Sequence, residues 1–152
     1  MRRLLYLLLL IPFLCTVSCR DSYYVENDLH GMWQVISVER FATGEVTEAQ
    51  GLLYCMFQRN MVSLCYKQIN VPEIMTHYIS HFDFVAQDSI GMGYFRKYTT
   101  GEGSLVEDEI KIPLNKLNKF GIYQDYTIFR MNQSKQKLVL TSDSACITLR
   151  KY

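Results

Sequence analysis

The sequence has 152 residues, which is enough for one domain with a sizeable core. Hydrophobic residues make up 49% and aromatic residues 13% of the chain, a composition that excludes disorder and is typical of a β-rich globular protein. The formal net charge is +1, and without Arg2 and Arg3 in the N-terminal leader 14 basic residues face 15 acidic ones. The chain therefore has no positive field to attract nucleic acid, and we exclude that class of partner.

Residues 1–18 have the organisation of a secretory signal peptide. Met1-Arg2-Arg3 provides a positive start, and residues 4–14 form an apolar run. This run is too short for a membrane-spanning helix, which needs ~20 apolar residues, but it fits the apolar segment of a signal peptide, which has ~7–15. We therefore predict that the chain is exported from the cytoplasm.

The end of this leader resembles the bacterial lipoprotein box, in which the mature chain begins at a lipidated cysteine. Cys19 takes that position, with Ser18 as the small residue before it, whereas Thr16 stands where the box usually has leucine. Cys15 is a second candidate acceptor, and an ordinary signal peptide that releases a soluble product is the alternative. Lipidation of Cys19 would add acyl chains such as palmitate, and each buried CH₂ group contributes ~0.8 kcal/mol to membrane binding.

The residue after the lipidated cysteine bears on the membrane to which such a protein is sent. An aspartate there is associated with retention at the inner membrane, and this chain has Arg20 instead. The resemblance therefore implies an anchor in the outer membrane, facing either the periplasm or the cell surface. Residues 19–28 would form a short polar tether between the lipid and the folded domain.

Residues 29–152 have the pattern of a single β-rich domain, which begins with a strand from Gly31 to Phe41. The period of two places Trp33, Val35 and Ser37 on one face and Met32, Gln34, Ile36 and Val38 on the other. Further strands are predicted for residues 51–57, 61–68, 74–87, 90–99, 106–112, 121–131, 137–141 and 145–151.

Several turns and glycines refine this pattern. Residues 58–60 connect a predicted hairpin, and Gly91 and Gly93 permit a bulge or a close approach of two backbones. Pro113 and Gly121 bracket one or two short helical turns before the late strands. The fold class is therefore all-β, with roughly eight antiparallel strands, the number that closes a small up-and-down barrel.

Residues 29–152 resemble the lipocalin-like domain of small lipoproteins from Gram-negative bacteria. Gly31-Met32-Trp33 matches the glycine-x-tryptophan motif of the first strand, and Phe120-Gly121-Ile122 with residues 138–142 resembles the C-terminal half of the family. Arg150 stands on the predicted last strand. In lipocalins such an arginine lies across the motif tryptophan, so the resemblance implies a cation–π contact of ~0.5–2 kcal/mol between Arg150 and Trp33.

Three cysteines remain in the domain: Cys55, Cys65 and Cys146. The cell envelope is oxidising, so a bridge between Cys55 and Cys65 on the two arms of the predicted hairpin is one alternative. A loop with an odd number of residues would place them on the same face, and a two-residue loop would place them on opposite faces. Buried free thiols that act as small apolar residues are the other alternative.

The sequence contains no pattern that we interpret as a catalytic or metal site. His77 and His81 are four residues apart, which on a strand separates them by ~13 Å, too far for a common ion. Gly91-Met92-Gly93 lacks the third glycine and the helix of a phosphate loop, and residues 107–109 form a solvated charge run. We therefore expect neither enzymatic activity, nor a cofactor, nor a metal.

Two functions remain open at this point. The first is the binding of a small apolar ligand in the mouth or cavity of the barrel by aromatic wall residues, for which the candidates are Tyr54, Phe57, Tyr78, Phe82, Phe84, Tyr94 and Tyr126. The second is a solid barrel, filled by the same bulky side chains, whose outer surface serves as an interaction module in an envelope complex. The fold alone does not decide between these functions.

The predicted anchor has a direct test in the Cys19→Ala substitution. We expect the variant to lose metabolic labelling with palmitate and to leave the membrane fraction, because the thioether link needs the Cys19 sulfur. Cys15→Ala should label like the wild type. Labelling that survives Cys19→Ala and disappears in Cys15→Ala would move the acceptor to Cys15.

Overall fold

A computed structural model describes residues 28–67, 75–98 and 111–152 of the chain. The strands are β1 (Gly31–Arg40), β2 (Glu45–Glu48), β3 (Leu53–Gln58), β4 (Met61–Lys67), β5 (Met75–Ala86), β6 (Ser89–Gly93), β7 (Arg96–Tyr98), β8 (Tyr126–Gln133), β9 (Lys137–Thr141) and β10 (Ala145–Lys151), and the helices are α2 (Leu114–Leu117) and the 3₁₀ turn η2 (Asn118–Phe120). The predicted signal peptide, Cys19, the tether through residue 27 and the 107–109 charge run lie outside the described residues.

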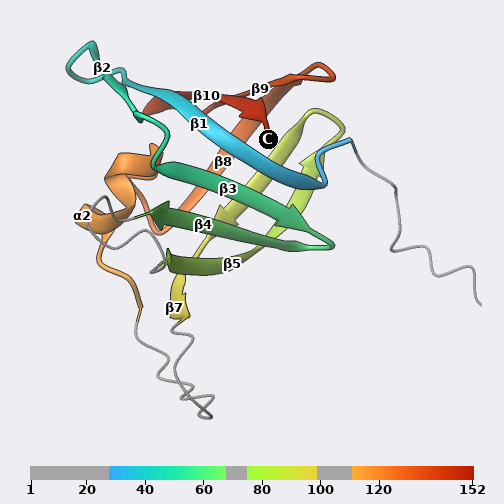
Figure 1. The fold of residues 1–152 in the computed structure, drawn as a ribbon, viewed down its shortest axis with the longest axis horizontal. Helices are drawn as coiled ribbons and strands as arrows, with labels where there is room; N and C mark the ends of the chain where they lie inside the picture. The colour runs from blue at the N-terminus through green and yellow to red at the C-terminus, as the bar shows by residue number, and fades with distance from the viewer. Residues whose placement is uncertain (1–27, 68–74, 99–110) are drawn as a thin grey trace, which may run out of the picture.

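Eight of these strands close into an antiparallel barrel, as the sequence predicts (Figure 1). The hydrogen-bonded order is β10-β9-β8-β6-β5-β4-β3-β1, and β1 pairs with β10 to complete the ring. Strand β2 extends the pairing of β1 beyond the end of β3, and β7 pairs with the first half of β5. Sequence neighbours mostly pair with each other, which is the up-and-down arrangement.

A β-bulge changes the predicted faces of β1. Trp33 and Val35 point into the core, as expected, but the pairing with β10 shifts register between Val35 and Ser37. The extra residue reverses the alternation beyond that point, so Val38 is buried and Ile36 is 38% exposed. The predicted placement of Ser37 with Trp33, and of Val38 on the opposite face, is therefore wrong.

The hairpin of β3 and β4 has a two-residue turn. Gln58 pairs with Met61, and Arg59 in the turn has a φ of +56°. Cys55 consequently pairs with Leu64, while Cys65 pairs with Tyr54. The two thiols lie on opposite faces of the sheet, and both are free, which excludes the bridge and leaves the buried-thiol alternative.

Gly91 and Gly93 accept close neighbours, as the sequence predicts. A Cβ atom at Gly91 would overlap the Tyr126 hydroxyl, and one at Gly93 would overlap the backbone carbonyl of Asp125. The next residue, Tyr94, has a φ of +55°, and the predicted single strand over residues 90–99 is therefore divided into β6 and β7.

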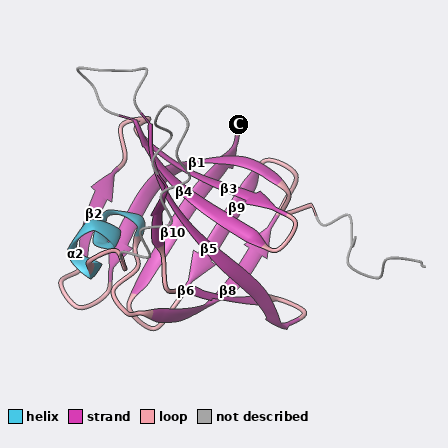
Figure 2. Ribbon diagram, turned by 90° about the horizontal axis from the view of Figure 1, so that it is seen from below, coloured by secondary structure: helices cyan, strands magenta, loops and turns pink. Residues whose placement is uncertain are grey.

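The interior of the barrel is filled by side chains. A continuous hydrophobic cluster includes Trp33, Phe57, Phe95, Phe120 and Phe129, each at most 1% exposed. The predicted short helix is present, and α2 and η2 lie at one end of the barrel (Figure 2), where Leu117 and Phe120 enter the same cluster. Among the described residues, no helix is long and apolar enough to cross a membrane.

Lys151, rather than Arg150, covers the motif tryptophan. Trp33 donates from Nε1 to the Leu29 carbonyl at 2.8 Å, and Lys151 Nζ lies 4.5 Å from the centre of the Trp33 ring. The β1–β10 register explains this exchange, because Trp33 faces Lys151 directly whereas Arg150 faces Gln34 on the other side of the sheet. Arg150 is exposed and donates to the Gln34 side chain at 2.8 Å, so the expected Arg150–Trp33 contact is wrong.

Lys151 also joins the last strand to the segment before β1. Its ammonium group donates to the backbone carbonyls of Asp28 and His30 at 3.0 and 2.6 Å. These bonds satisfy two carbonyls and hold the cation near the indole, which combines charge-assisted hydrogen bonding with a cation–π contact.

A matched pair of substitutions tests this arrangement. We expect Lys151→Met to lower the free energy of unfolding by ~1–3 kcal/mol, because it removes the charge and its hydrogen bonds but keeps most of the apolar stem. Arg150→Met should cost less than ~0.5 kcal/mol, because Arg150 is exposed. Urea unfolding followed by Trp33 fluorescence measures both, and a larger loss for Arg150→Met would reverse our assignment.

Candidate functional site

The seven predicted wall residues do not form one pocket. Phe57, Tyr78 and Phe82 are buried in the core, where Phe82 packs edge-on against Phe57 with ring centroids 5.4 Å apart. Phe84 continues from Phe82 at 5.7 Å but is 48% exposed. The candidate wall residues thus fall into two sets, one in the packed interior and one at the barrel surface.

The other three wall candidates lie toward the surface. Tyr94 and Tyr126 are 64% and 40% exposed, and their ring centroids are 6.4 Å apart. Tyr54 is half-buried and packs edge-on against Tyr152, with centroids 5.5 Å apart. Sequence alternation alone could not separate these positions from the interior ones, because strand starts, turns and bulges decide which face each residue takes.

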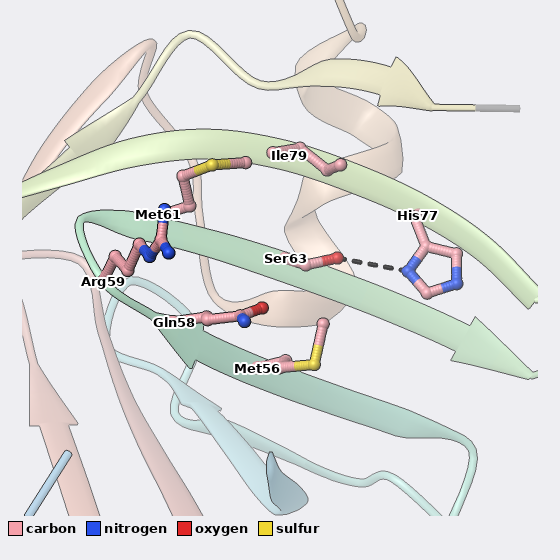
Figure 3. Close-up of a pocket in the computed structure, with 7 residues that line it drawn as sticks. All are labelled: Met56, Gln58, Arg59, Met61, Ser63, His77 and Ile79. Carbon is pink, nitrogen blue, oxygen red and sulfur yellow. Dashed lines mark hydrogen bonds between the residues drawn. The ribbon is translucent and has the colours of Figure 1, made fainter. Parts of the chain in front are cut away.

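An apolar groove of about 410 Å³ lies on the outer face of β3, β4 and β5 (Figure 3). The groove is lined by Met56, Gln58, Arg59, Met61, Ser63, His77 and Ile79. Arg59 and His77 lie toward opposite ends, with the methionine and isoleucine side chains between them (Figure 3). The site thus has polar ends and an apolar middle.

The strand register explains why these residues share a face. Met56 pairs with Ser63, which pairs with Ile79, and this gives one row across the three strands. Cys65 and His77 are partners in the adjacent row. Because β4 carries residues 61, 63 and 65 outward, its two-residue turn from β3 brings the methionines, the serine and the cysteine onto one surface.

A compact polar cluster lies at one end of the groove. His77 Nδ1 is 3.2 Å from Cys65 Sγ and 3.2 Å from Ser63 Oγ, and the Ser63 and Cys65 side chains are 3.5 Å apart. Cys65 is 1% exposed and Ser63 is 6% exposed. Burial raises the pKa of Cys65 above its usual value, and the hydrogen bond with Ser63 opposes this shift.

The two histidines of β5 occupy different surroundings. His77 contacts the Cys65–Ser63 cluster, whereas His81 is exposed. Within the described parts of the chain, no three His, Cys, Asp or Glu side chains form a group that could hold a metal ion. Any ion held here would therefore need a ligand of another type.

Two further hollows differ in chemistry from the groove. The first, of about 630 Å³, lies along β8 and the β9–β10 turn and is lined mostly by polar residues, with Gln124, Arg130 and Asp143 among them. The second, of about 170 Å³, lies beside β2 and includes Leu53, Tyr66 and Lys119. Lys119 Nζ lies 3.5 Å from the centre of the Tyr66 ring, and burial lowers the pKa of Lys119.

Residues 13–152 match the family model described as a lipocalin-like domain. The chain belongs to the lipocalin-like domain family. This agrees with the closed barrel and with the position of Gly31 and Trp33 at the start of β1. No curated protein matches the sequence significantly.

Two solved structures share the lipocalin-like fold with this chain. A lipocalin-like protein from Bacteroides uniformis ATCC 8492 superposes with a TM-score of 0.57 at 16% identity, over 83% of this chain and 100% of the other. An uncharacterized protein from Bacteroides eggerthii DSM 20697 gives a TM-score of 0.60 at 15% identity, over 82% and 99% of the two chains. At these identities the likeness concerns the fold, and the site must be argued from the residues of this lipocalin-like chain.

Sequence reasoning missed the outer groove. Met56, Met61, Ser63 and Ile79 follow the period of two, but that signal acquires meaning only once the hairpin turn is known to have two residues. The Cys65–His77 contact also joins residues 12 positions apart on separate strands. This contact depends on the register between β4 and β5, and no local sequence pattern specifies that register.

Because Cys65 is buried, we predict that its thiol reacts slowly with alkylating reagents. In folded, reduced protein, iodoacetamide should modify half-buried Cys146 before Cys65 and Cys55, because both buried thiols have raised pKa values and a smaller reactive thiolate fraction. Alkylation of Cys65 should accelerate as the pH rises toward its raised pKa. Peptide mapping by mass spectrometry measures each site, and equal rates for Cys65 and Cys146 at pH 8 would contradict the assignment.

Proposed function

We propose that this chain is a lipid-anchored protein of the outer membrane that binds a small amphipathic molecule in the outer groove of a solid barrel. The groove beside His77 is the observation that carries the proposal. Its volume of about 410 Å³ lies within the ~300–1,000 Å³ typical of ligand sites. Cys19 would provide the anchor, and residues 20–28 the tether.

The filled interior argues against a ligand in the centre of the barrel. Phe57, Tyr78 and Phe82, which we expected to line such a cavity, are at most 6% exposed and pack against one another or against Phe120. Emptying that space would require large side chains to leave a packed core, and cavities of that kind cost several kcal/mol. Binding in the outer groove avoids this cost in free energy, so we place the ligand there.

The lining of the groove defines the class of ligand. Met56, Met61 and Ile79 offer apolar contact, and methionine side chains adapt to different shapes. His77 and Ser63 offer hydrogen bonds at one end. This combination favours a molecule with an apolar body and one polar group, bound without covalent chemistry.

The arrangement favours binding over catalysis. A Cys–His pair can form a nucleophilic site when the thiol is activated, but burial raises the pKa of Cys65 and so favours the unreactive thiol. The lipocalin-like fold also hosts binding functions in general, although function must be argued from the site.

A second candidate is the interaction module, which the filled interior favours. In that case the groove would receive a side chain or segment of a partner protein in an envelope complex. Native mass spectrometry of the protein purified from membranes distinguishes the two functions, because a small ligand adds a discrete low mass and a partner adds the mass of a polypeptide.

Ile79→Glu tests the small-ligand function. A carboxylate in the middle of the apolar groove should abolish a ligand-derived mass and reduce binding of an apolar fluorescent dye at least about tenfold, because it removes the apolar contact of Ile79 and must lose water when an apolar molecule covers it. Ile36→Glu is the matched control, since Ile36 is 38% exposed on β1 and does not line this groove.

Both variants should unfold at temperatures near that of the wild type, because both side chains are partly exposed. Equal dye binding by Ile79→Glu and the wild type would place the ligand elsewhere. Loss of binding in Ile36→Glu as well would indicate a nonspecific effect and also contradict the proposal.

A further inference from the structure

We propose that Cys65 and His77 bind a soft monovalent metal ion of the Cu(I) type, with the Met56 thioether as a third ligand. This inference goes beyond the small-molecule function and does not require it, although the ion would enter through the same groove. The site shares Met56 and His77 with the groove of the proposed small ligand and adds the Cys65 thiol, which does not line that groove.

The two strongest donors already lie at nearly the separation that a metal requires. Cys65 and His77 are direct partners on β4 and β5, and Sγ is 3.2 Å from Nδ1. Metal–sulfur and metal–nitrogen bonds of about 2.3 and 2.0 Å, as in zinc sites, would separate these atoms by about 3.5–3.7 Å at angles of 109–120°. The pair must open from 3.2 Å by about 0.3–0.5 Å, which side-chain rotation can provide.

The third donor comes from the neighbouring row of the sheet. Met56 pairs with Ser63, so it is the diagonal neighbour of Cys65 across the β3–β4 hairpin. Diagonal neighbours have Cβ atoms ~7–8 Å apart, a distance that long side chains span. Met56 lines the groove with His77, and its flexible thioether side chain lies on the same face (Figure 3).

The donor set selects the kind of metal. Thiolate and thioether sulfur with one imidazole nitrogen is a soft set, which favours Cu(I) over hard ions such as Mg²⁺ and Ca²⁺. Structural zinc sites need four ligands and are usually built from cysteine and histidine, and the described residues contain no group of three such side chains or carboxylates that could hold an ion. Two or three soft ligands suffice for a monovalent d¹⁰ ion.

Charge balance leads to the same choice. The outward positions around the pair on β3, β4 and β5 are Tyr54, Met56, Gln58, Met61, Ser63, Lys67, Ile79 and His81, and none of these is acidic. On the flanking strand β7, the partners of His77 and Ile79 are Tyr98 and Arg96, which are not acidic either. One thiolate neutralises a monovalent ion, whereas a divalent ion would leave a net positive charge in a buried setting next to Lys67. Burying an uncompensated charge is unfavourable, so the site discriminates against divalent ions.

Binding would replace the thiol proton by the metal. In the metal-free protein the Cys65 thiol lies 3.2 Å from His77 Nδ1. The incoming ion binds the Cys65 sulfur, the thiol proton leaves to solvent, and the His77 ring contributes the Nδ1 lone pair. Ser63 Oγ, 3.2 Å from the same nitrogen, holds the ring in its orientation while the site is metal-free.

The experiment uses the full-length protein, purified from membranes in detergent, reduced and kept without oxygen. Cu(I) is titrated in competition with a chromophoric Cu(I) chelator, and Ag(I) is used as a redox-inert probe in native mass spectrometry. We expect Cys65→Ser and His77→Ala to weaken Cu(I) binding at least about tenfold, and Met56→Leu to weaken it by less. Cys146→Ala and His81→Ala are the matched controls and should bind like the wild type.

Three outcomes would overturn the proposal: wild-type affinity in Cys65→Ser, an equal loss in Cys146→Ala, or Zn(II) binding as tight as Cu(I) binding. Cys65→Ser retains a hydroxyl that can bond with Ser63, and thermal unfolding of each variant verifies that it remains folded. Ile79→Glu should lose the apolar ligand but keep Cu(I), so failure of the small-ligand function and failure of the metal site are distinguishable.

Discussion

The pairing of β1 with β10 is the constraint on which the rest of the structure depends. It joins the two ends of the domain in antiparallel register from Trp33↔Lys151 to Arg40↔Ala145 and converts an open sheet into a ring. Closure removes the exposed edges that an open sheet would present at its first and last strands. It also defines an inside and an outside, so the side chain of each barrel-strand residue points either into the core or toward the outer surface.

In the described strands, most of the inward side chains are apolar and pack against one another. Large residues such as Trp33, Phe57 and Phe129 fill the centre, and Leu117 and Phe120 of the short helical segment extend the same cluster. A barrel of eight strands is just wide enough for side chains to meet across it. Bulky side chains therefore fill the described interior of this barrel, and the apolar groove lies on its outer surface.

The set of residues on the outer surface depends on register. The β3–β4–β5 sheet presents two rows, in which Met56, Ser63 and Ile79 lie beside Cys65 and His77. These residues come from three strands and make an apolar groove that ends in a polar cluster. At the β1–β10 seam the same rule gives Lys151 to the indole and Arg150 to Gln34. A shift of one residue in strand register would exchange the side chains on the two faces of the sheet and so change the chemistry of the outer surface.

The sequence by itself determined the class of fold, the number of barrel strands, the short helix and the close approaches at Gly91 and Gly93. These features rest on local signals: period-two hydrophobicity, proline and glycine positions, and the absence of a Cβ atom. The tertiary structure alone decided the bulge after Val35, the opposite faces of Cys55 and Cys65, the residue over Trp33 and the place of the groove. Each of these is a matter of register between strands, which depends on turn length and barrel closure and leaves no mark within a single strand.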